Sequence, residues 1–358
     1  MMLNFEHMDD KFYMKRCLQL AALGKAYVAP NPMVGAVLVH EGRVIGEGFH
    51  RKYGEAHAEV NCIESVLPED AEFISSSTLY VSLEPCSHQG KTGPCTSFII
   101  KHKIPRVIIG CLDSYEKVNG TGVELLKEAG IEVISGILQD EARELNKRFY
   151  TFHEKQRPYI ILKWAQTASG FIGEKDKSIQ ISNNQTNILV HTWRAEEAAI
   201  MVGTNTALAD NPSLTVRHVP GKNPLRLVID KNLKIPADFH LLDKQSPTIV
   251  INTIKNEEDG DLLFYKISSE ENIVAVVISL LHMRNITSLI IEGGSMLIES
   301  FIAEGMWDEA RVITSSTKNI NDGIPAPRLS FASLVKTKNI DTDQVQFFKN
   351  NREIFAGI

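Results

Sequence analysis

Four side chains in the first hundred residues have the types and spacing of a catalytic metal site. His57 and Glu59 are separated by one residue, and Cys86 and Cys95 each follow a proline. One histidine and two cysteines give Zn²⁺ three protein ligands and leave its fourth position open, which is typical of catalytic zinc. We therefore predict that His57, Cys86 and Cys95 bind Zn²⁺ and that Glu59 is catalytic.

The chemistry of such a site is hydrolytic deamination. The pattern H-x-E followed by P-C-x-x-C is the signature of zinc-dependent deaminases, in which the glutamate moves protons without binding the metal. Zinc lowers the pKa of its bound water from about 15.7 to about 7, so hydroxide forms at neutral pH. Hydroxide attacks an amidine-type ring carbon, the glutamate delivers protons, and ammonia leaves. Any one of these residues alone is more often structural, but four matched positions favour the catalytic interpretation.

The two halves of the motif require helix starts. Residues two apart point to nearly opposite sides of a regular helix, so His57 and Glu59 cannot both face one metal from a helix interior. We expect them at the start of a helix that begins near Ala58. Cys95 follows Gly93-Pro94, which predicts a second helix start, where the helix dipole favours a thiolate. Two helix starts should therefore converge on one cation.

The segment between the cysteines departs from the compact signature, because eight residues separate Cys86 from Cys95. It reads PCSHQGKTGPC and resembles the deaminase domain of the bifunctional riboflavin-biosynthesis deaminase/reductase family, whose loop reads P-C-x-H-x-G-K-T-x-P-C. NPMVGAV, which begins at Asn31, and GFH, which ends at His50, match the same family. The resemblance implies that Asn31, His50 and Lys91 contact the substrate. On the residues alone, Asn31 is a turn residue and Lys91 a solvated loop charge.

The second half of the chain has no G-x-G-x-x-G, so it carries no classical dinucleotide fingerprint. Glu292-Gly293-Gly294-Ser295 predicts a glycine turn between a strand and a helix N-terminus, which is a natural anion site. Three stretches are similar to the reductase domain of the same family: LKWAQTASGFI (162–172), VGTNTALADNPSLTVR (202–217) and IEGGSML (291–297). The family's reductase domain has a dihydrofolate-reductase-like fold and uses NADPH.

The resemblance carries two sets of residues onto this half. The substrate contacts that it implies are Ser178, Arg194, Leu214, Arg217 and Glu292, and the NADPH contacts are Thr206, Asp210 and the turn at Gly294. Arg194 and Arg217 are the candidates for a sugar phosphate, because the planar guanidinium makes bidentate charge-assisted bonds. Two positions depart from many relatives: Ser169 stands where they have aspartate, and Gln180 where they have tryptophan.

The periodicity of apolar residues predicts the elements that position these side chains. A helix over 9–24 and a hairpin of strands over 34–39 and 44–49 open the chain. Helices from about 58, from about 94 and over 124–129 then alternate with strands over 78–83, 106–109 and 131–134. After a charged segment at 146–158, strands are expected over 159–164, 199–202, 225–230, 248–252, 289–291 and 345–348, with helices over 184–194 and 295–303.

This alternation predicts an α/β chain with two domains. The first spans 1–153, with helices on both faces of one sheet, and the second spans 158–358. The resemblance implies a zinc-dependent pyrimidine deaminase for the first and an NADPH-dependent reductase for the second. The resemblance implies a cytidine-deaminase-like three-layer α/β/α fold for the first and a dihydrofolate-reductase-like α/β fold for the second.

Composition narrows the partners of the protein. A net charge of −6 disfavours a grip on nucleic acid, and no apolar stretch approaches the roughly 20 residues that span a bilayer. Five scattered cysteines and a first segment without a secretory pattern fit a reducing cytoplasm. We therefore expect a cytoplasmic protein with neither nucleic acid nor membrane as partner. The resemblance implies that it uses Zn²⁺ and NADPH on a small phosphorylated pyrimidine. A homo-oligomer is the assembly that relatives suggest.

The resemblance implies two consecutive reactions. The first is deamination of 2,5-diamino-6-(5-phosphoribosylamino)pyrimidin-4-one, and the second is reduction of the ribosyl side chain of 5-amino-6-(5-phosphoribosylamino)uracil to ribityl. Two alternatives stay open at the level of sequence. A transfer-RNA adenosine deaminase with an added domain would use the same zinc chemistry. A deaminase with a degenerate, ligand-sensing second domain is left open by Ser169 and Gln180.

Overall fold

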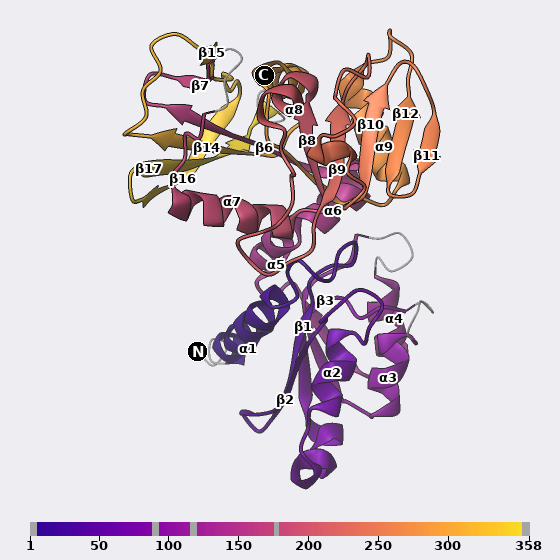
Figure 1. Ribbon diagram of the computed structural model, residues 1–358. Helices are drawn as coiled ribbons and strands as arrows, with labels where there is room; N and C mark the ends of the chain where they lie inside the picture. Colours follow the sequence, from indigo (N-terminus) through magenta and orange to yellow (C-terminus); the bar gives the residue numbers. More distant parts are fainter. Residues whose placement is uncertain (1–5, 88–92, 115–119, 175–178, 353–358) are drawn as a thin grey trace. The chain divides into compact units, whose positions relative to one another are not determined.

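The chain divides into two compact units, Met1–Gln156 and Arg157–Ile358, and each is described by itself. The computed structural model describes residues 6–87, 93–114, 120–174 and 179–352 (Figure 1). The division falls inside the charged segment at 146–158. None of the helices in the described ranges is long and apolar enough to cross a membrane.

The first unit is built on a five-stranded sheet with the strand order β2-β1-β3-β4-β5. The strands are β1 (Gly35–His40), β2 (Arg43–Phe49), β3 (Thr78–Leu83), β4 (Arg106–Cys111) and β5 (Glu132–Ser135). The helices are α1 (Glu6–Ala22), α2 (Ala58–Glu64), η1 (Pro68–Ser76), α3 (Cys95–Lys101), α4 (Thr121–Glu128), α5 (Gln139–Leu145) and α6 (Lys147–Lys155). β1 pairs antiparallel with β2 and β3, whereas β3, β4 and β5 are parallel. The predicted hairpin and the alternation after it are confirmed.

Helices cover both faces of this sheet, as the sequence predicts (Figure 1). Alternate residues of β1 point to opposite faces. Ala36 and Leu38 pack with residues of α2, α3 and α4, whereas Val37 and Val39 pack with residues of α1. The result is a three-layer α/β/α unit whose zinc-motif helices, α2 and α3, lie on the same face.

The charged segment at 146–158, for which the sequence predicted no element, forms helix α6 over Lys147–Lys155. Its charges conceal a helical apolar face: Phe149, Tyr150 and Phe152 are buried. Phe149 and Tyr150 pack with Leu83 and Cys111 at the ends of β3 and β4. The segment therefore completes the core of the first unit and is not an open linker.

Two glycines allow helices to approach the sheet closely. A Cβ at Gly35 of β1 would overlap the backbone oxygen of Cys17 in α1. A Cβ at Gly48 of β2 would overlap the backbone nitrogen of Cys62 in α2. Because α2 carries the zinc-motif histidine at its start, Gly48 sets how near that helix lies to the sheet.

The second unit is built on a ten-stranded sheet with the order β11-β12-β10-β9-β8-β13-β6-β14-β17-β16. Its strands are β6 (Tyr159–Thr167), β8 (Ala199–Gly203), β9 (Leu225–Ile229), β10 (Thr248–Asn252), β11 (Glu257–Asp259), β12 (Leu262–Lys266), β13 (Ser288–Ile291), β14 (Glu309–Ser315), β16 (Ala332–Ile340) and β17 (Asp343–Asn350). The run from β12 to β14 is parallel, and β17 returns antiparallel to β14. A separate pair joins β7 (Phe171–Gly173) to β15 (Ile324–Pro325).

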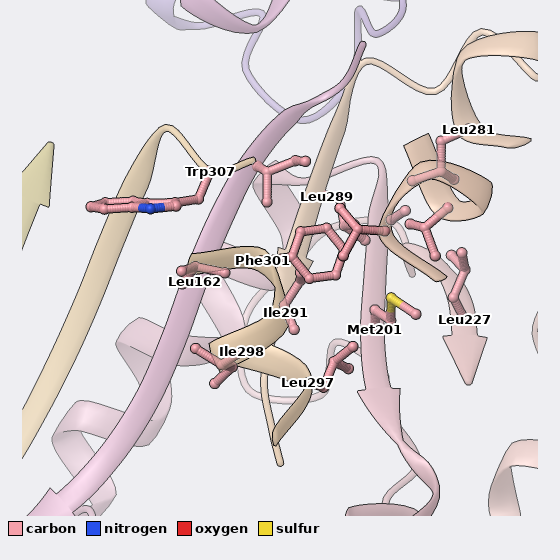
Figure 2. Packing of buried hydrophobic residues seen from close by; sticks show 14 of the residues in the cluster. Leu162, Met201, Leu227, Leu281, Leu289, Ile291, Leu297, Ile298, Phe301 and Trp307 are labelled. Carbon is pink, nitrogen blue, oxygen red and sulfur yellow. The ribbon is translucent and has the colours of Figure 1, made fainter. Parts of the chain in front are cut away.

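The helices of this unit lie on both faces of the central strands. They are α7 (Asn184–Glu196), α8 (Thr204–Asp210), η2 (His240–Leu242), α9 (Ile273–Met283) and α10 (Ser295–Glu304). Figure 2 shows Ile298 and Phe301 of α10 packed near Leu162 of β6 and Ile291 of β13. Trp193 of α7 belongs to the core on the opposite face. Strands covered on both faces read as continuous apolar runs, which is why the sequence predicted them.

The elements of this unit that the sequence did not predict include β12, β14, β16 and helices α8 and α9. The apolar run of α9 is too uniform for an amphipathic signal, because residues all along it pack against the core. β16 lacks a sequence signal for a different reason. It is an edge strand with mostly exposed residues, so no alternation of apolar and polar residues marks it.

Replacing Gly48 with alanine should destabilise the first unit and loosen the start of α2. The added methyl group meets backbone, which cannot rotate away, so we expect a loss of about 3 kcal/mol in the free energy of unfolding. Calorimetry and zinc content measure the effect. Tryptophan fluorescence provides the internal reference, because all three tryptophans lie in the second unit. An unchanged melting temperature of the first unit would show that the helix can shift at no cost.

Candidate active sites

Three donor atoms of the first unit lie close enough together to share one metal ion. His57 Nδ1 lies 3.5 Å from Cys86 Sγ and 3.4 Å from Cys95 Sγ. All three atoms lie within 4.8 Å of one another. A tetrahedral zinc with usual bond lengths separates a nitrogen ligand from a sulfur ligand by about 3.6 Å. Both nitrogen–sulfur distances therefore fit a shared Zn²⁺.

Both predicted helix starts are present at this site. His57 is the extended N-cap of α2, and Glu59 lies in the first turn of that helix. Cys95 is the first residue of α3, with Pro94 as its N-cap. The backbone N–H of Cys95 donates to Cys86 Sγ at 3.4 Å, so the helix start contacts the other sulfur directly. Partial positive charge at a helix N-terminus favours the thiolate that zinc requires.

The long insertion does not separate the two cysteines. The backbone N–H and the Oγ1 of Thr96 both donate to the carbonyl oxygen of Cys86, at 3.2 and 3.3 Å. These bonds hold Cys86 against the first turn of α3. Lys91, which the resemblance placed at the substrate, lies outside the described residues.

A buried carboxylate fixes the segment that leads into Cys86. Glu84 accepts hydrogen bonds from four backbone N–H groups, those of Asp113, Gly120, Gly122 and Val123, at 2.9 to 3.3 Å. A Cβ at Gly122 would also overlap the carbonyl oxygen of Pro85. The start of α4 is therefore bound tightly to the loop that carries the ligand.

Burial shifts the protonation of the Glu59 carboxyl group towards neutral pH. Burial, together with the negative charge of Cys86, raises the pKa of Glu59 to about 7. The pKa of the Cys86 thiol is lowered, chiefly because Cys95 donates a hydrogen bond to it and also because His57 does. A group that takes up and returns a proton works best with a pKa near the working pH.

The residues Asn31 and His50 form one hydrogen-bonded unit beside the metal donors. His50 Nδ1 donates to the carbonyl oxygen of Ala56 at 3.1 Å, so its Nε2 accepts from Asn31 Nδ2 at 3.3 Å. Burial lowers the pKa of His50, which keeps the ring neutral in this arrangement. The His50 and His57 rings meet edge to face at 5.3 Å. The structure thus brings both predicted residues to the zinc motif.

In the second unit, predicted residues meet at the carboxyl ends of adjacent parallel strands. Glu292 follows β13 directly, and Ile291 pairs with Leu162 of β6 and Met201 of β8. Arg194 of α7 donates to Glu292 through Nε at 2.8 Å and Nη2 at 2.7 Å, a bidentate pair. Ligands of open α/β sheets bind at this edge, so the cluster lies where a reductase site is expected.

Comparisons with known proteins now decide the family. Residues 158–317 match the family model of the RibD C-terminal domain, and residues 7–111 match that of the cytidine and deoxycytidylate deaminase zinc-binding region. The riboflavin biosynthesis protein RibD of Aquifex aeolicus is 39% identical over 360 residues, which cover 95% of this chain and 98% of that protein. The chain belongs to the RibD family. It is a bifunctional enzyme, a zinc-dependent deaminase joined to a reductase.

Solved structures of the RibD family match both units together. A Thermotoga maritima protein, described as a diaminohydroxyphosphoribosylaminopyrimidine deaminase/5-amino-6-(5-phosphoribosylamino)uracil reductase, is 33% identical with a TM-score of 0.87. Acinetobacter baumannii RibD is 28% identical with a TM-score of 0.88. Each comparison covers 96% of this chain and 99% of the other. The predicted pairing of a deaminase-like with a reductase fold is confirmed.

In this RibD chain the ion pair at the reductase edge includes a lysine. Lys163 Nζ of β6 lies 3.6 Å from Glu292 Oε2, and all three side chains of the cluster are largely buried. Burial alone would raise the pKa of Glu292, but the charges of Arg194 and Lys163 outweigh it and lower the pKa to about 2. The guanidinium of Arg194 is thus committed to Glu292, whereas Arg217 is exposed.

The segment that carries Leu214 and Arg217 is held from two sides. The backbone N–H of Arg217 donates to His191 Nδ1 at 3.0 Å. The buried Arg226 donates through Nη1 to the carbonyl oxygen of Ser213 at 3.2 Å. The Leu214 side chain is buried in the core with a left-handed backbone, φ 52°. The side chain of Leu214 therefore serves the core of this unit.

The glycine turn of the RibD reductase domain is present as predicted. Gly293 has φ 146°, a conformation that favours glycine, and the backbone N–H of Gly294 donates to Thr206 Oγ1 at 2.9 Å. Gly294 is the N-cap of α10, so the turn lies at a helix N-terminus. A Cβ at Gly294 would lie only 3.2 Å from Thr206 Oγ1. Asp210 is exposed at the end of α8, one turn beyond Thr206.

The two departures from many RibD relatives have distinct surroundings. Ser169 Oγ hydrogen-bonds with Thr167 Oγ1 at 2.8 Å and donates to the carbonyl oxygen of Ile320 at 3.0 Å. Ser169 therefore connects the turn after β6 to the loop that contains Ile320. Gln180 is exposed, and its Nε2 donates to the carbonyl oxygen of Ser182 at 3.3 Å. Ser178, a predicted substrate contact, lies outside the described residues.

Sequence reasoning missed residues that act on the sites through backbone atoms. These are Glu84, Thr96, His191 and Arg226. Thr96 had a local signal, because it follows Cys95 at a predicted helix start. The other three carried none, since their partners lie 13 to 39 residues away.

Replacing Glu292 with glutamine should remove a pH dependence of the second unit. The carboxylate stabilises the fold above its ordinary pKa near 4.5, and this stabilisation is lost as the pH falls towards 2. The variant leaves Arg194 and Lys163 buried without a counter-charge, so we expect a loss of about 3 to 5 kcal/mol at pH 7. Urea unfolding followed by tryptophan fluorescence measures both effects. Parallel pH profiles for variant and wild type would contradict this account.

Proposed function

We propose that the first unit deaminates 2,5-diamino-6-(5-phosphoribosylamino)pyrimidin-4-one. The observation that carries this proposal is the triangle of His57 Nδ1 and two cysteine sulfurs beside the buried Glu59. In this proposal His57, Cys86 and Cys95 hold Zn²⁺, which when bound supplies the acidity that makes water a nucleophile near neutral pH. The domain that performs the reaction spans residues 1–153.

Glu59 moves the protons of the reaction. It takes one proton from the attacking water and delivers it to the ring nitrogen, then takes the proton left on the added hydroxyl group and delivers it to the departing amine. A C–O bond forms, the C–N bond breaks, and ammonia leaves. Asn31 Nδ2 is committed to His50, so Asn31 Oδ1 is the atom offered to an N–H group of the pyrimidine. Lys91 completes the proposed substrate contacts.

We further propose that residues 158–358 reduce the ribosyl side chain of 5-amino-6-(5-phosphoribosylamino)uracil to ribityl. NADPH, when bound, supplies the hydride, and Thr206, Asp210 and the Gly294 turn are the residues that would hold it. The tight turn at a helix N-terminus supports this, because such a turn suits a phosphate. Ser178, Arg194, Leu214, Arg217 and Glu292 form the proposed substrate side.

Within that side, Arg217 is the residue for the sugar phosphate. Its side chain is exposed and its backbone is fixed by His191, whereas Arg194 orients Glu292.

The cysteines of the first unit form no disulfide among the described residues, which suits a reducing compartment and supports a cytoplasmic protein. Following ammonia release and NADPH oxidation separately tests both activities: ammonia without NADPH oxidation would overturn the proposal for the second unit.

Replacing Glu59 with glutamine should lower kcat of deamination about 10²- to 10⁴-fold while zinc remains bound. The amide keeps the size of the side chain but cannot carry a proton. The matched control is Glu64→Gln, an exposed position at the end of the same helix. Ammonia release and metal content are the measurements. Full turnover in E59Q would overturn the mechanism, and zinc loss would show that Glu59 serves the metal.

Replacing Arg217 with alanine should raise the KM of the reductase for its phosphorylated substrate about 10- to 100-fold, because a charged hydrogen bond to phosphate is lost. The dephosphorylated substrate should show no such increase. Arg284→Ala, an exposed arginine at the end of α9, is the control. An equal effect on both substrates would show that Arg217 does not bind the phosphate.

A further inference from the structure

We propose that Asn146 is a positioning residue of the deaminase site. It holds the backbone of Met33 and thereby sets the side chain of Asn31 against the pyrimidine. The inference rests on the proposed substrate contact of Asn31 and adds a residue that lies 113 positions from Met33.

The Asn146 side chain binds both backbone groups of Met33. The N–H of Met33 donates to Asn146 Oδ1 at 2.8 Å, and Asn146 Nδ2 donates to the carbonyl oxygen of Met33 at 2.8 Å. Asn146 is only 3% exposed. The opposite orientation of the amide would place donor against donor and acceptor against acceptor. The side chain therefore gives Met33 the paired bonds that a neighbouring strand would give it.

Met33, which Asn146 holds, lies in the same short segment as Asn31. The N–H of Asn31 donates to the carbonyl oxygen of Val28 at 2.9 Å, and the N–H of His50 donates to that of Val34 at 2.9 Å. Met33 lies between these two points and precedes β1, so regular sheet pairing begins only after it. Asn146 fixes the irregular part of the chain that a substrate contact requires.

Asn146 is itself held rigidly. Its N–H donates to the carbonyl oxygen of Ala142 at the end of α5, and its own carbonyl accepts from the N–H of Tyr150 in α6. Ala142 and Tyr150 belong to one apolar cluster, against which Val34 also packs. The hydrogen bonds of Asn146 to Met33 and the packing of Val34 thus hold two neighbouring residues of one segment. Movement of Met33 would therefore move Asn31, whose amide reaches His50 at 3.3 Å.

An isosteric substitution separates positioning from size. Asn146→Asp keeps the acceptor for the Met33 N–H but turns a carboxylate oxygen towards the Met33 carbonyl, which repels it. A displaced Asn31 binds the pyrimidine less well, whereas the metal donors and Glu59 lie on other segments. We expect the KM for the diaminopyrimidine phosphate to rise about 10- to 100-fold, with kcat and zinc content within about twofold of wild type.

The experiment is a double-mutant cycle in the full-length zinc enzyme. N31A, N146D and N31A/N146D are compared by ammonia release, with the reductase rate of the same chain as internal reference. If Asn146 acts through Asn31, N146D raises KM in the wild-type background and adds nothing in N31A. The control is Asp140→Asn, an exposed position in the first turn of α5 that should leave KM unchanged.

Each other outcome overturns the inference. Additive increases in KM would show that Asn146 acts elsewhere, and zinc loss or a lower kcat at unchanged KM would show a structural role only. A raised KM in N31A with none in N146D would overturn the inference and keep the contact of Asn31. An unchanged KM in N31A would overturn that contact and the inference together. If N146D does not fold, N146S, which removes both bonds without adding charge, replaces it with the same outcomes.

Discussion

The structure of the first unit depends on one constraint: two sulfur atoms and a ring nitrogen from separate segments must come within 4.8 Å of one another. Two helix starts satisfy it, because a helix start presents a side chain and unpaired backbone N–H groups at the same place. His57 is the N-cap of α2, and Cys95 opens α3 with its N–H directed at Cys86 Sγ. Other side chains of α2 and α3 pack in the core, and this packing fixes the positions of the two helix starts.

The same principle explains why Glu59 belongs to this site. Glu59 lies in the first turn of α2, two residues after His57. The turn of the helix places its side chain outside the set of three donor atoms, and the side chain is buried beside them. Burial is what brings the pKa of this carboxyl group to about 7. Glu59 and one of the metal donors, His57, are thus both placed by the start of α2.

The second unit solves a different problem, since its residues come from several strands of a parallel sheet. Parallel strands end at the same edge, so Glu292 after β13 and Lys163 within β6 become neighbours through strand register. Arg194 then closes a buried ion cluster from α7. In both units, buried polar side chains bind the backbone of distant loops: Glu84 and Asn146 do so in the first, His191 and Arg226 in the second. Such bonds give irregular segments the order that sheets and helices obtain from their own ladders.

Sequence alone determined both helix starts, the helices on both faces of the first sheet and most central strands of the second unit, and it predicts the zinc donors and the catalytic glutamate. These follow from local signals: residue types at fixed spacing, proline before a helix, and apolar periodicity. Tertiary structure decided what depends on distant partners. It showed that Arg194 is committed to Glu292, that the Leu214 side chain is buried, and that Asn146 clamps Met33. A hydrogen bond across 113 residues leaves no trace in local pattern, because only the folded chain brings its two ends together.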